Sequence, residues 1–253
     1  MEKLNEIKLR DNYDAVFHLI TAANGAESFY TLSNNKVRTE SIEEARILDS
    51  KIIKSWVGHP HFKIIDNSTD FNTKMDRLAN EVCNLIGEPM PIKVQRKYLV
   101  SIPNINRLYE ESSCNCVDIM QTYLVSDDKN VEKRIRQRGI NGDYVYTITE
   151  NRRISSLETM YTGKIISQEE YLSLMMNADT TLHQISKKRY CFVHENEAYE
   201  LDIYPFSNKK AILEVTLTDK IKKITIPKFI NVIKEVTHEK AYKNYELART
   251  LTL

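Results

Sequence analysis

The chain has 253 residues, of which 42% are hydrophobic and 28% charged, and a formal net charge of +1. This length allows one large domain or two modest ones, and this composition is ordinary for a soluble globular protein. The small net charge excludes a global attraction to nucleic acid or to a membrane, so an anion site must come from a local concentration of charge.

Targeting signals and reactive cysteine motifs are absent from the sequence. No apolar run approaches the roughly 18 residues that a membrane-spanning helix needs, and the polar start Met1–Glu6 is unlike a secretory signal. No two cysteines have the C-x-x-C spacing of a zinc site. We therefore expect a cytoplasmic protein with reduced, structural thiols, the alternative being a redox or metal role. The cysteines are Cys83, Cys114, Cys116 and Cys191.

The first third of the chain shows an α/β pattern. The short apolar runs Ala15–Ile20 and Phe62–Asp66 are typical of buried strands. Between them lies a predicted helix that begins with a capping box at Ser41, and a second helix is predicted over Phe71–Ile86. The Gly and Pro residues of Gly87–Pro91 end that helix, and we place a domain boundary there.

This boundary divides the chain into regions 1–90 and 91–253, and the second region is rich in short β-type runs. One predicted helix, with Ser167 as its N-cap, interrupts them. Many strands at short spacing with turn signals between them indicate an antiparallel barrel or sandwich. The predicted strands are Val94–Ile102, Val117–Ser126, Val131–Arg138, Tyr144–Thr149, Lys188–His194, Ala198–Tyr204 and Ile212–Leu217.

Three arginines alternate along one of these strands. An extended backbone places Arg134, Arg136 and Arg138 on one side, about 6.6 Å apart from one to the next. Like charges a few Å apart repel by up to about 4 kcal/mol near a protein surface, so such a row normally faces carboxylates, a bound anion or water. The dipeptide Asn141-Gly142 predicts a tight turn into a return strand.

Several segments of region 91–253 together resemble the CYTH, or triphosphate tunnel metalloenzyme, superfamily in order and spacing. They are Lys93–Val100, Arg134–Arg136, Lys187–Tyr190, Glu200–Asp202 and Leu213–Leu217. The resemblance implies an α+β protein in which an antiparallel β-tunnel, a CYTH-like barrel, presents cations inward to phosphate. The strand pattern alone would equally allow solvated strand faces. The corresponding cations are Lys97, Arg134, Arg136, Lys187 and Arg189.

Region 1–90 resembles the second half of a NadR-like P-loop NTPase domain, through Tyr13–Ala23, Arg38–Arg46 and Gly58–Thr69. This pairing of domains is similar to the TRPL-translocation-defect protein family, whose members are described as GTP-binding and phosphoinositide-binding. This resemblance implies that a few side chains of region 1–90 contact a nucleotide. The alternative is that these side chains form ordinary ion pairs on a helix surface. No G-x-x-x-x-G-K-[ST] motif occurs, so we expect no nucleotide hydrolysis by the P-loop route. The implied nucleotide-binding residues are Arg38, Arg46 and Asp66.

Acidic residues of the CYTH pattern are depleted in this chain. The family's ExExK strand corresponds to Lys93-x-Gln95-x-Lys97, which keeps the lysine and lacks both glutamates. A hard cation such as Mg²⁺ or Mn²⁺ is held mainly through carboxylate oxygens, and the resemblance leaves Asp202 and Glu214 for that role. These two side chains could ligate a metal or neutralise the arginines, and we favour the second interpretation.

We therefore expect binding of a polyphosphorylated ligand in the basic tunnel, with weak or no hydrolysis. The ligand classes implied by the resemblance are a nucleoside triphosphate, inorganic polyphosphate and a phosphoinositide headgroup. One alternative is a divalent-metal-dependent triphosphatase of the CYTH superfamily. Another is an interaction module that docks a partner through region 1–90. The near-zero net charge argues against a nucleic-acid partner.

Overall fold

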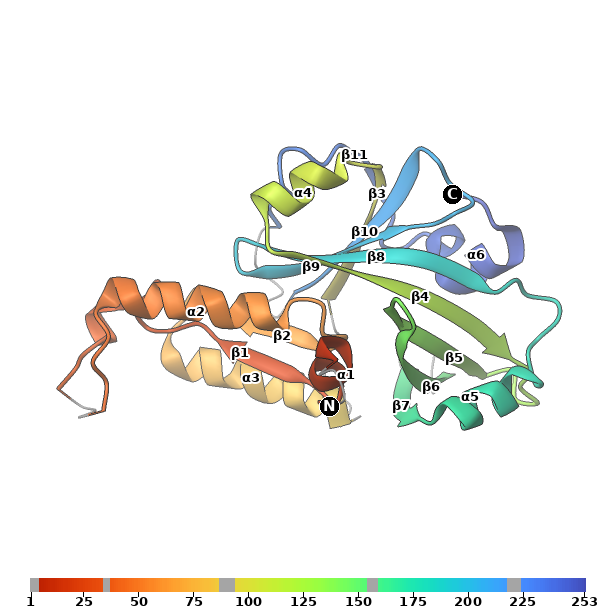
Figure 1. The fold of residues 1–253 in the computed structure, drawn as a ribbon, viewed down its shortest axis with the longest axis horizontal. Helices are drawn as coiled ribbons and strands as arrows, with labels where there is room; N and C mark the ends of the chain where they lie inside the picture. The colour runs from red at the N-terminus through yellow and green to blue at the C-terminus, as the bar shows by residue number, and fades with distance from the viewer. Residues whose placement is uncertain (1–4, 34–36, 87–93, 154–158, 218–223) are drawn as a thin grey trace.

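The computed structural model describes residues 5–33, 37–86, 94–153, 159–217 and 224–253. Figure 1 shows two parts, an N-terminal unit comprising the described residues up to 86 and a large antiparallel sheet formed by the rest. The predicted boundary at 87–91, and Lys93 beside it, lie outside the described residues. None of the described helices is long and apolar enough to cross a membrane.

A parallel pair of strands between helices forms the N-terminal unit. Its elements are α1 (Glu6–Asp11), β1 (Val16–Leu19), η1 (Glu27–Phe29), α2 (Ile42–Trp56), β2 (Phe62–Ile65) and α3 (Phe71–Ile86). Strands β1 and β2 pair in parallel, and α2 and α3 lie on opposite sides of the pair (Figure 1). Both predicted strands and both predicted helices are confirmed, as is the capping box at Ser41.

Helix α3 buries charged side chains against the ends of the two strands. Lys74 and Arg77 are each less than a tenth exposed, whereas Val82 is 38% exposed. The Lys74 Nζ donates to the carbonyl of Ile20 at 2.8 Å, and an Arg77 guanidinium nitrogen donates to the carbonyl of Asp66 at 2.8 Å. These cations therefore supply donors to backbone oxygens at the carboxyl ends of β1 and β2.

The large sheet has nine antiparallel strands in the order β11-β3-β10-β9-β8-β4-β5-β6-β7. The strands are β3 (Val94–Ser101), β4 (Cys114–Leu124), β5 (Val131–Ile140), β6 (Asp143–Arg153), β7 (Thr159–Ile166), β8 (Ile185–His194), β9 (Glu197–Ile203), β10 (Lys210–Leu217) and β11 (Val232–Glu235). The helical elements are α4 (Ile105–Glu111), α5 (Gln168–Met175), η2 (Lys240–Tyr242) and α6 (Asn244–Thr250). Asn141 and Gly142 join β5 to β6 with φ values of 55° and 93°, which confirms the predicted turn.

The predicted α+β fold class and antiparallel sheet are confirmed, but the sheet is open in the part of the chain that the structure describes. There, the strand pairing begins at β11 and ends at β7, and no pairing joins these two edges. The sheet is strongly bent instead. Figure 1 shows β3, β8, β9 and β10 on one side of the bend and β5, β6 and β7 on the other, with the long β4 passing between them.

The two faces of the large sheet bury different cores. One face packs Phe192 and Leu213 against Leu108 of α4. We call the opposite face the inner face. Along β8 its side chains begin at Ile185, which joins an apolar cluster with the C-terminal helix α6, and end at Cys191, which joins a cluster with the N-terminal unit. The inner-face positions between these two apolar ends carry charge.

Candidate functional site

Five predicted phosphate-binding cations lie on the inner face, and we call them the cationic row. Cross-strand partners share one face of a sheet, so the register decides this placement. Arg189 lies opposite Asp202, and Lys97 lies opposite Glu214. Ile185 of β8 lies opposite Gln121 of β4, which lies opposite Arg136 of β5. The row is Lys97 on β3, Lys187 and Arg189 on β8, and Arg134 and Arg136 on β5.

One half of this row is neutralised by buried carboxylates. Asp202, which has no exposed surface, accepts from Lys187 Nζ at 2.5 Å and from Arg189 Nε and Nη2 at 2.6 and 2.7 Å. Arg189 also donates to Glu200. Lys97 Nζ lies 2.6 Å from a Glu214 oxygen. Lys97, Lys187 and Arg189, with Glu200, Asp202 and Glu214, form what we call the paired half.

Titration of the paired half follows from this burial and pairing. Burial alone would raise the pKa of the Asp202 carboxyl, but the charges of Arg189 and Lys187 outweigh it and hold that pKa below its usual range. The pKa of Glu214 is lowered in the same way by Lys97 and Arg189. Burial lowers the pKa of Lys187 to about 8, against the attraction of Asp202. The carboxylates are therefore ionised at neutral pH.

Arg134 and Arg136 form the other half of the row, which we call the arginine pair, and each donates a hydrogen bond to a neutral side-chain oxygen. Arg134 Nε donates to Thr149 Oγ1 at 2.9 Å, and Arg136 Nη2 donates to Gln121 Oε1 at 3.2 Å. The Gln121 amide in turn donates to the Tyr123 hydroxyl at 2.9 Å. The carboxylate of Glu132 lies 4.0 Å from Arg134, whose side chain is 17% exposed. Each arginine of the pair thus donates to a neutral acceptor, in contrast to the direct contacts of Lys187 and Arg189 with Asp202.

The third arginine of β5 has a structural partner in the N-terminal unit. Arg138 is 6% exposed and donates to the Asp11 carboxylate and to the carbonyl of Gly58. Asp11 also accepts from Arg10 Nε at 2.8 Å. Gly58 has a φ of +96°, and a Cβ there would lie 2.9 Å from the Arg10 guanidinium. The sequence predicted Arg138 in one row with Arg134 and Arg136, whereas the structure makes it one of the contacts between the two parts of the protein.

The two carboxylates considered as metal ligands are counter-ions in the structure. Both Asp202 oxygens accept hydrogen bonds from cations. One Glu214 oxygen pairs with Lys97, and the other accepts from Gln95 Nε2 at 2.9 Å. Among the described residues, no group of three or more His, Cys, Asp or Glu side chains is placed to hold a metal ion. The donor set does not fit Mg²⁺ or Mn²⁺, because cations and an amide of the chain already occupy its oxygens.

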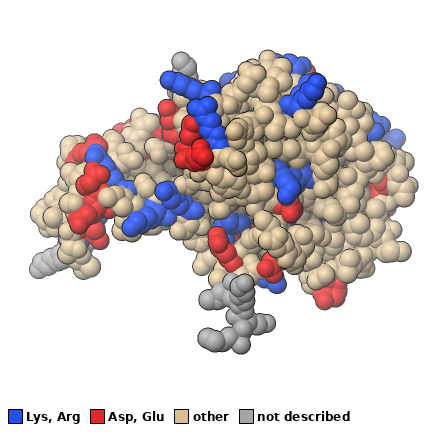
Figure 2. Space-filling model, turned by 45° about the horizontal axis from the view of Figure 1, so that its top comes forward, with Lys and Arg blue, Asp and Glu red and all other residues tan. Residues whose placement is uncertain are grey.

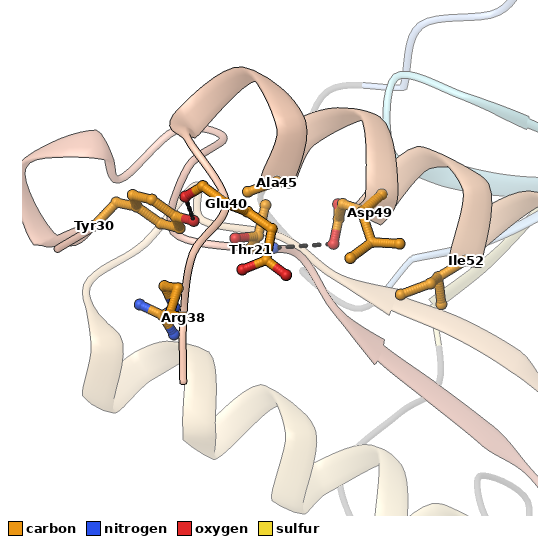
Figure 3. A pocket seen from close by; sticks show the side chains of 8 residues that line it. Thr21, Tyr30, Arg38, Glu40, Ala45, Asp49 and Ile52 are labelled. Atoms are coloured by element: carbon orange, nitrogen blue, oxygen red, sulfur yellow. Dashed lines mark hydrogen bonds between the residues drawn. The ribbon is translucent and has the colours of Figure 1, made fainter. Parts of the chain in front are cut away.

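The three residues predicted to contact nucleotide are not brought together. Arg46 donates to the carbonyl of Ala23 and to Glu27, both at 2.6 Å. Asp66 pairs with Arg77 at 2.8 Å. Arg38 lines a hollow of about 210 Å³ under α2 (Figure 3). The other lining residues are Thr21, Tyr30, Glu40, Ala45, Leu48, Asp49 and Ile52.

Neither the charges on the face drawn in Figure 2 nor the two hollows point to the cationic row. On the face drawn in Figure 2, basic and acidic side chains alternate in small groups, and no broad area of one sign is seen. A second hollow, of about 360 Å³, lies beside Tyr242 and Leu253. Neither hollow is lined by a residue of the cationic row. The partly buried members of the row are Lys97, Arg134 and Arg136, whereas Lys187 and Arg189 are buried, so we expect a ligand to reach the row through the first three.

Sequence reasoning did not single out the neutral groups beside the arginine pair. Gln121 is fully buried and Tyr123 is 2% exposed, although both are polar. Burial raises the pKa of Tyr123, while Arg134 opposes that shift. The available signal was their alternation on β4, which places both on the face that carries Arg134 and Arg136.

Comparisons with known proteins give distant structural similarity. No family model matches the chain, and no curated protein matches it. The inorganic triphosphatase NE1496 is similar over 64% of this chain and 97% of its own, with 23% identity and a TM-score of 0.45. The PH1819 protein from Pyrococcus horikoshii is similar over 49% of this chain and 80% of its own, with 15% identity and a TM-score of 0.35.

A third similar structure is the Hippeastrum protein HpAC1, described with a dominant triphosphatase activity. It is similar over 50% of this chain and 80% of its own, with 10% identity and a TM-score of 0.36. Because all three TM-scores lie below 0.5, the case for function rests on the side chains of this chain.

Proposed function

We propose that this protein binds a polyphosphorylated small molecule at the arginine pair, with weak or no hydrolysis. One observation carries the proposal. Arg134 and Arg136 stand on one face of β5, where each donates a hydrogen bond to a neutral side chain, Thr149 or Gln121. A guanidinium in such a setting favours an anion that can accept two hydrogen bonds in one plane.

The spacing of the arginine pair favours a chain of phosphates over a single one. Alternate residues of a strand are about 6.6 Å apart, so two guanidiniums can contact successive phosphoryl groups. Each charge-assisted contact contributes on the order of 1.5 to 3 kcal/mol, and several of them reach micromolar affinity. Lys97, at the opposite rim of the row, would supply the next contact to a longer ligand.

Weak hydrolysis follows from the state of the carboxylates. Asp202 and Glu214 would have to release Lys187, Arg189 and Lys97 before they could ligate a divalent ion. Removing those counter-ions would leave buried cations without partners, which costs several kcal/mol. The metal-dependent triphosphatase therefore remains the competing function, and phosphate release is the measurement that separates the two.

Calorimetric titration against a panel of anions tests the binding function. The panel contains inorganic triphosphate, ATP, GTP, longer polyphosphate and inositol phospholipid headgroups, each at low and high salt. We expect micromolar binding of triphosphate-containing ligands that weakens as salt rises, because the contacts are ionic. Single orthophosphate should bind much more weakly.

Two substitutions on adjacent residues of β5 make the titration specific. Arg134→Ala should weaken triphosphate binding about tenfold or more, since one charge-assisted contact is lost. Lys133→Ala is the matched control, because Lys133 points to the opposite face and pairs with Glu150 at 3.6 Å. Equal losses from both variants, or none from Arg134→Ala, would rule out the site. Phosphate release with Mg²⁺ or Mn²⁺ that is lost in Arg136→Ala would instead establish the triphosphatase.

A further inference from the structure

The buried hydroxyl of Tyr123 carries a proton that no described residue accepts. Arg136 Nη2 donates to Gln121 Oε1 at 3.2 Å, and an arginine can only donate, so the oxygen of the Gln121 amide faces Arg136. The NH₂ group of the same amide therefore faces Tyr123 and donates to its hydroxyl oxygen at 2.9 Å. The Tyr123 oxygen is thus an acceptor in this contact, and its own O–H donor is left over among the described residues.

Thr149 repeats this arrangement on the neighbouring strand. Its Oγ1 accepts from Arg134 Nε at 2.9 Å, and within the described ranges no residue accepts its hydroxyl proton. Thr149 is 6% exposed and Tyr123 is 2% exposed. Buried polar groups are normally hydrogen-bonded, so two such donors at one place indicate a ligand that accepts from them.

Both hydroxyls lie beside the guanidinium of Arg134. Tyr123 on β4 and Thr149 on β6 are the cross-strand partners of Arg134 on β5, so the three side chains stand side by side on one face. Arg134 Nη1 lies 4.0 Å from the Glu132 carboxylate, which is beyond hydrogen-bond distance. Burial raises the pKa of Tyr123, so its hydroxyl keeps the proton at neutral pH. A guanidinium and two hydroxyl donors therefore meet at one position of the inner face.

We propose that the Tyr123 and Thr149 hydroxyls bind the terminal phosphoryl group of the ligand at Arg134. A terminal phosphoryl group has three non-bridging oxygens, one for each of the three donors, whereas an inner group has two. The next phosphoryl group would then lie toward Arg136, about 6.6 Å along β5. Hydrogen bonds to a charged acceptor are strong when the donors are buried. This inference rests on the proposed binding function and adds two binding residues and the direction of the ligand.

Calorimetric titration with inorganic triphosphate and with cyclic trimetaphosphate tests the proposal, because trimetaphosphate has no terminal phosphoryl group. Tyr123→Phe and Thr149→Val each remove one hydroxyl and keep the shape of the side chain. Each should weaken triphosphate binding about fivefold to tenfold and change trimetaphosphate binding less than about twofold. A merely structural role would weaken the binding of both anions alike. Thr149→Ser, which keeps the hydroxyl, should bind triphosphate like the native chain.

Two substitutions on the opposite face of the sheet serve as controls. Tyr146 packs against Tyr171 of α5, and Thr122 accepts from Gln184 at 2.8 Å. Tyr146→Phe and Thr122→Val should leave both affinities unchanged. Urea denaturation confirms that each variant is folded.

The outcomes separate this inference from the proposed function. Native-like triphosphate affinity in either Tyr123→Phe or Thr149→Val, or equal losses for the two anions, would overturn the inference. If Arg134→Ala weakens triphosphate binding in the same experiment, the proposed function stands without it. If Arg134→Ala binds triphosphate like the native chain, the proposed function fails and the inference fails with it.

Discussion

The two halves of the cationic row use the same residue types in different ways. In the paired half, Lys187 and Asp202 have no exposed side-chain surface and contact each other directly. In the arginine pair, Arg134 is 17% exposed and donates to a threonine. A buried cation in direct contact with a carboxylate is part of the structure, whereas a partly exposed cation that donates to a neutral oxygen can still bind an anion.

Neighbouring strands explain this difference. Asp202 on β9 lies opposite Arg189, and Glu214 on β10 lies opposite Lys97. Beside Arg134, the opposite positions are Tyr123 on β4 and Thr149 on β6. Cross-strand pairs are the unit of side-chain interaction in a sheet, so the residues of adjacent strands decide the role of a cation. The comparison teaches that a basic strand alone does not define a phosphate site.

The largest effect should come from removing the central counter-ion of the paired half. Asp202→Ala leaves Lys187 and Arg189 buried without their shared carboxylate, and we expect a loss of about 3 to 5 kcal/mol in the free energy of unfolding. Glu235→Ala is the control, because its pair with Arg96 is about 40% exposed and should be worth less than about 1 kcal/mol. Urea denaturation measures both. Similar losses for the two variants would contradict the structural role of the paired half.

Substitution of Arg138 tests whether the ion-pair partner of an arginine, rather than its position on β5, decides its role. It lies on the same face of β5 as Arg134, but it is buried and paired with Asp11. Arg138→Ala should therefore cost about 2 to 4 kcal/mol of stability and leave the affinity for triphosphate within about twofold. Denaturation and calorimetry on one preparation give both values. A large fall in affinity from a folded Arg138→Ala protein would contradict the comparison.

Acid should weaken the paired half in a defined pH window. The pKa values of Asp202 and Glu214 are lowered from the ordinary values of 3.8 and 4.5. The unfolded chain then binds more protons than the native one, so stability is present above about pH 4.5 and is lost as the pH falls below it. Each carboxyl contributes a slope of up to about 1.4 kcal/mol per pH unit.

Urea titrations at several pH values below 5 measure this slope. In Asp202→Asn the slope should fall by the contribution of one carboxyl, because the amide does not titrate. A folded Asp202→Asn protein that keeps the full slope would show that other carboxylates cause the acid sensitivity.

Local patterns predicted much of the fold, because their causes lie within a few residues. Alternation placed Arg134 and Arg136 on one face of β5, and the Asn141-Gly142 pair marked its turn. The capping box at Ser41 marked the start of α2. These features depend on backbone geometry that the residues themselves determine.

Contacts between segments that are distant in the chain could not be predicted from the sequence. Asp11 and Arg138 are 127 residues apart, and no local pattern relates them. Lys74 is buried because its ammonium group donates to the carbonyl of Ile20 at the end of β1. A helical wheel of α3 gives no information about that carbonyl. The closed tunnel was inferred from a family resemblance, whereas the described strands form an open, bent sheet.

Lys97 is the borderline residue of the comparison, and its substitution should have the smallest effect. It pairs with Glu214 at 2.6 Å and so belongs to the paired half, but it is 17% exposed like Arg134. Lys97→Met should cost about 1 kcal/mol of stability, because Gln95 still donates to Glu214 and Arg189 lies 4.0 Å away.

A double-mutant cycle with Glu214→Gln tests whether Lys97 only neutralises Glu214 or also binds the ligand. If its main role is to neutralise Glu214, the two substitutions should couple by about 1 kcal/mol, and triphosphate affinity should change less than about threefold. If Lys97 binds the ligand, the stability losses of the two substitutions should be additive, and the affinity for triphosphate should fall about tenfold, as for Arg134→Ala. The first result would confine the phosphate site to β5. The second would extend the site across the bend of the sheet, as binding of a longer polyphosphate requires.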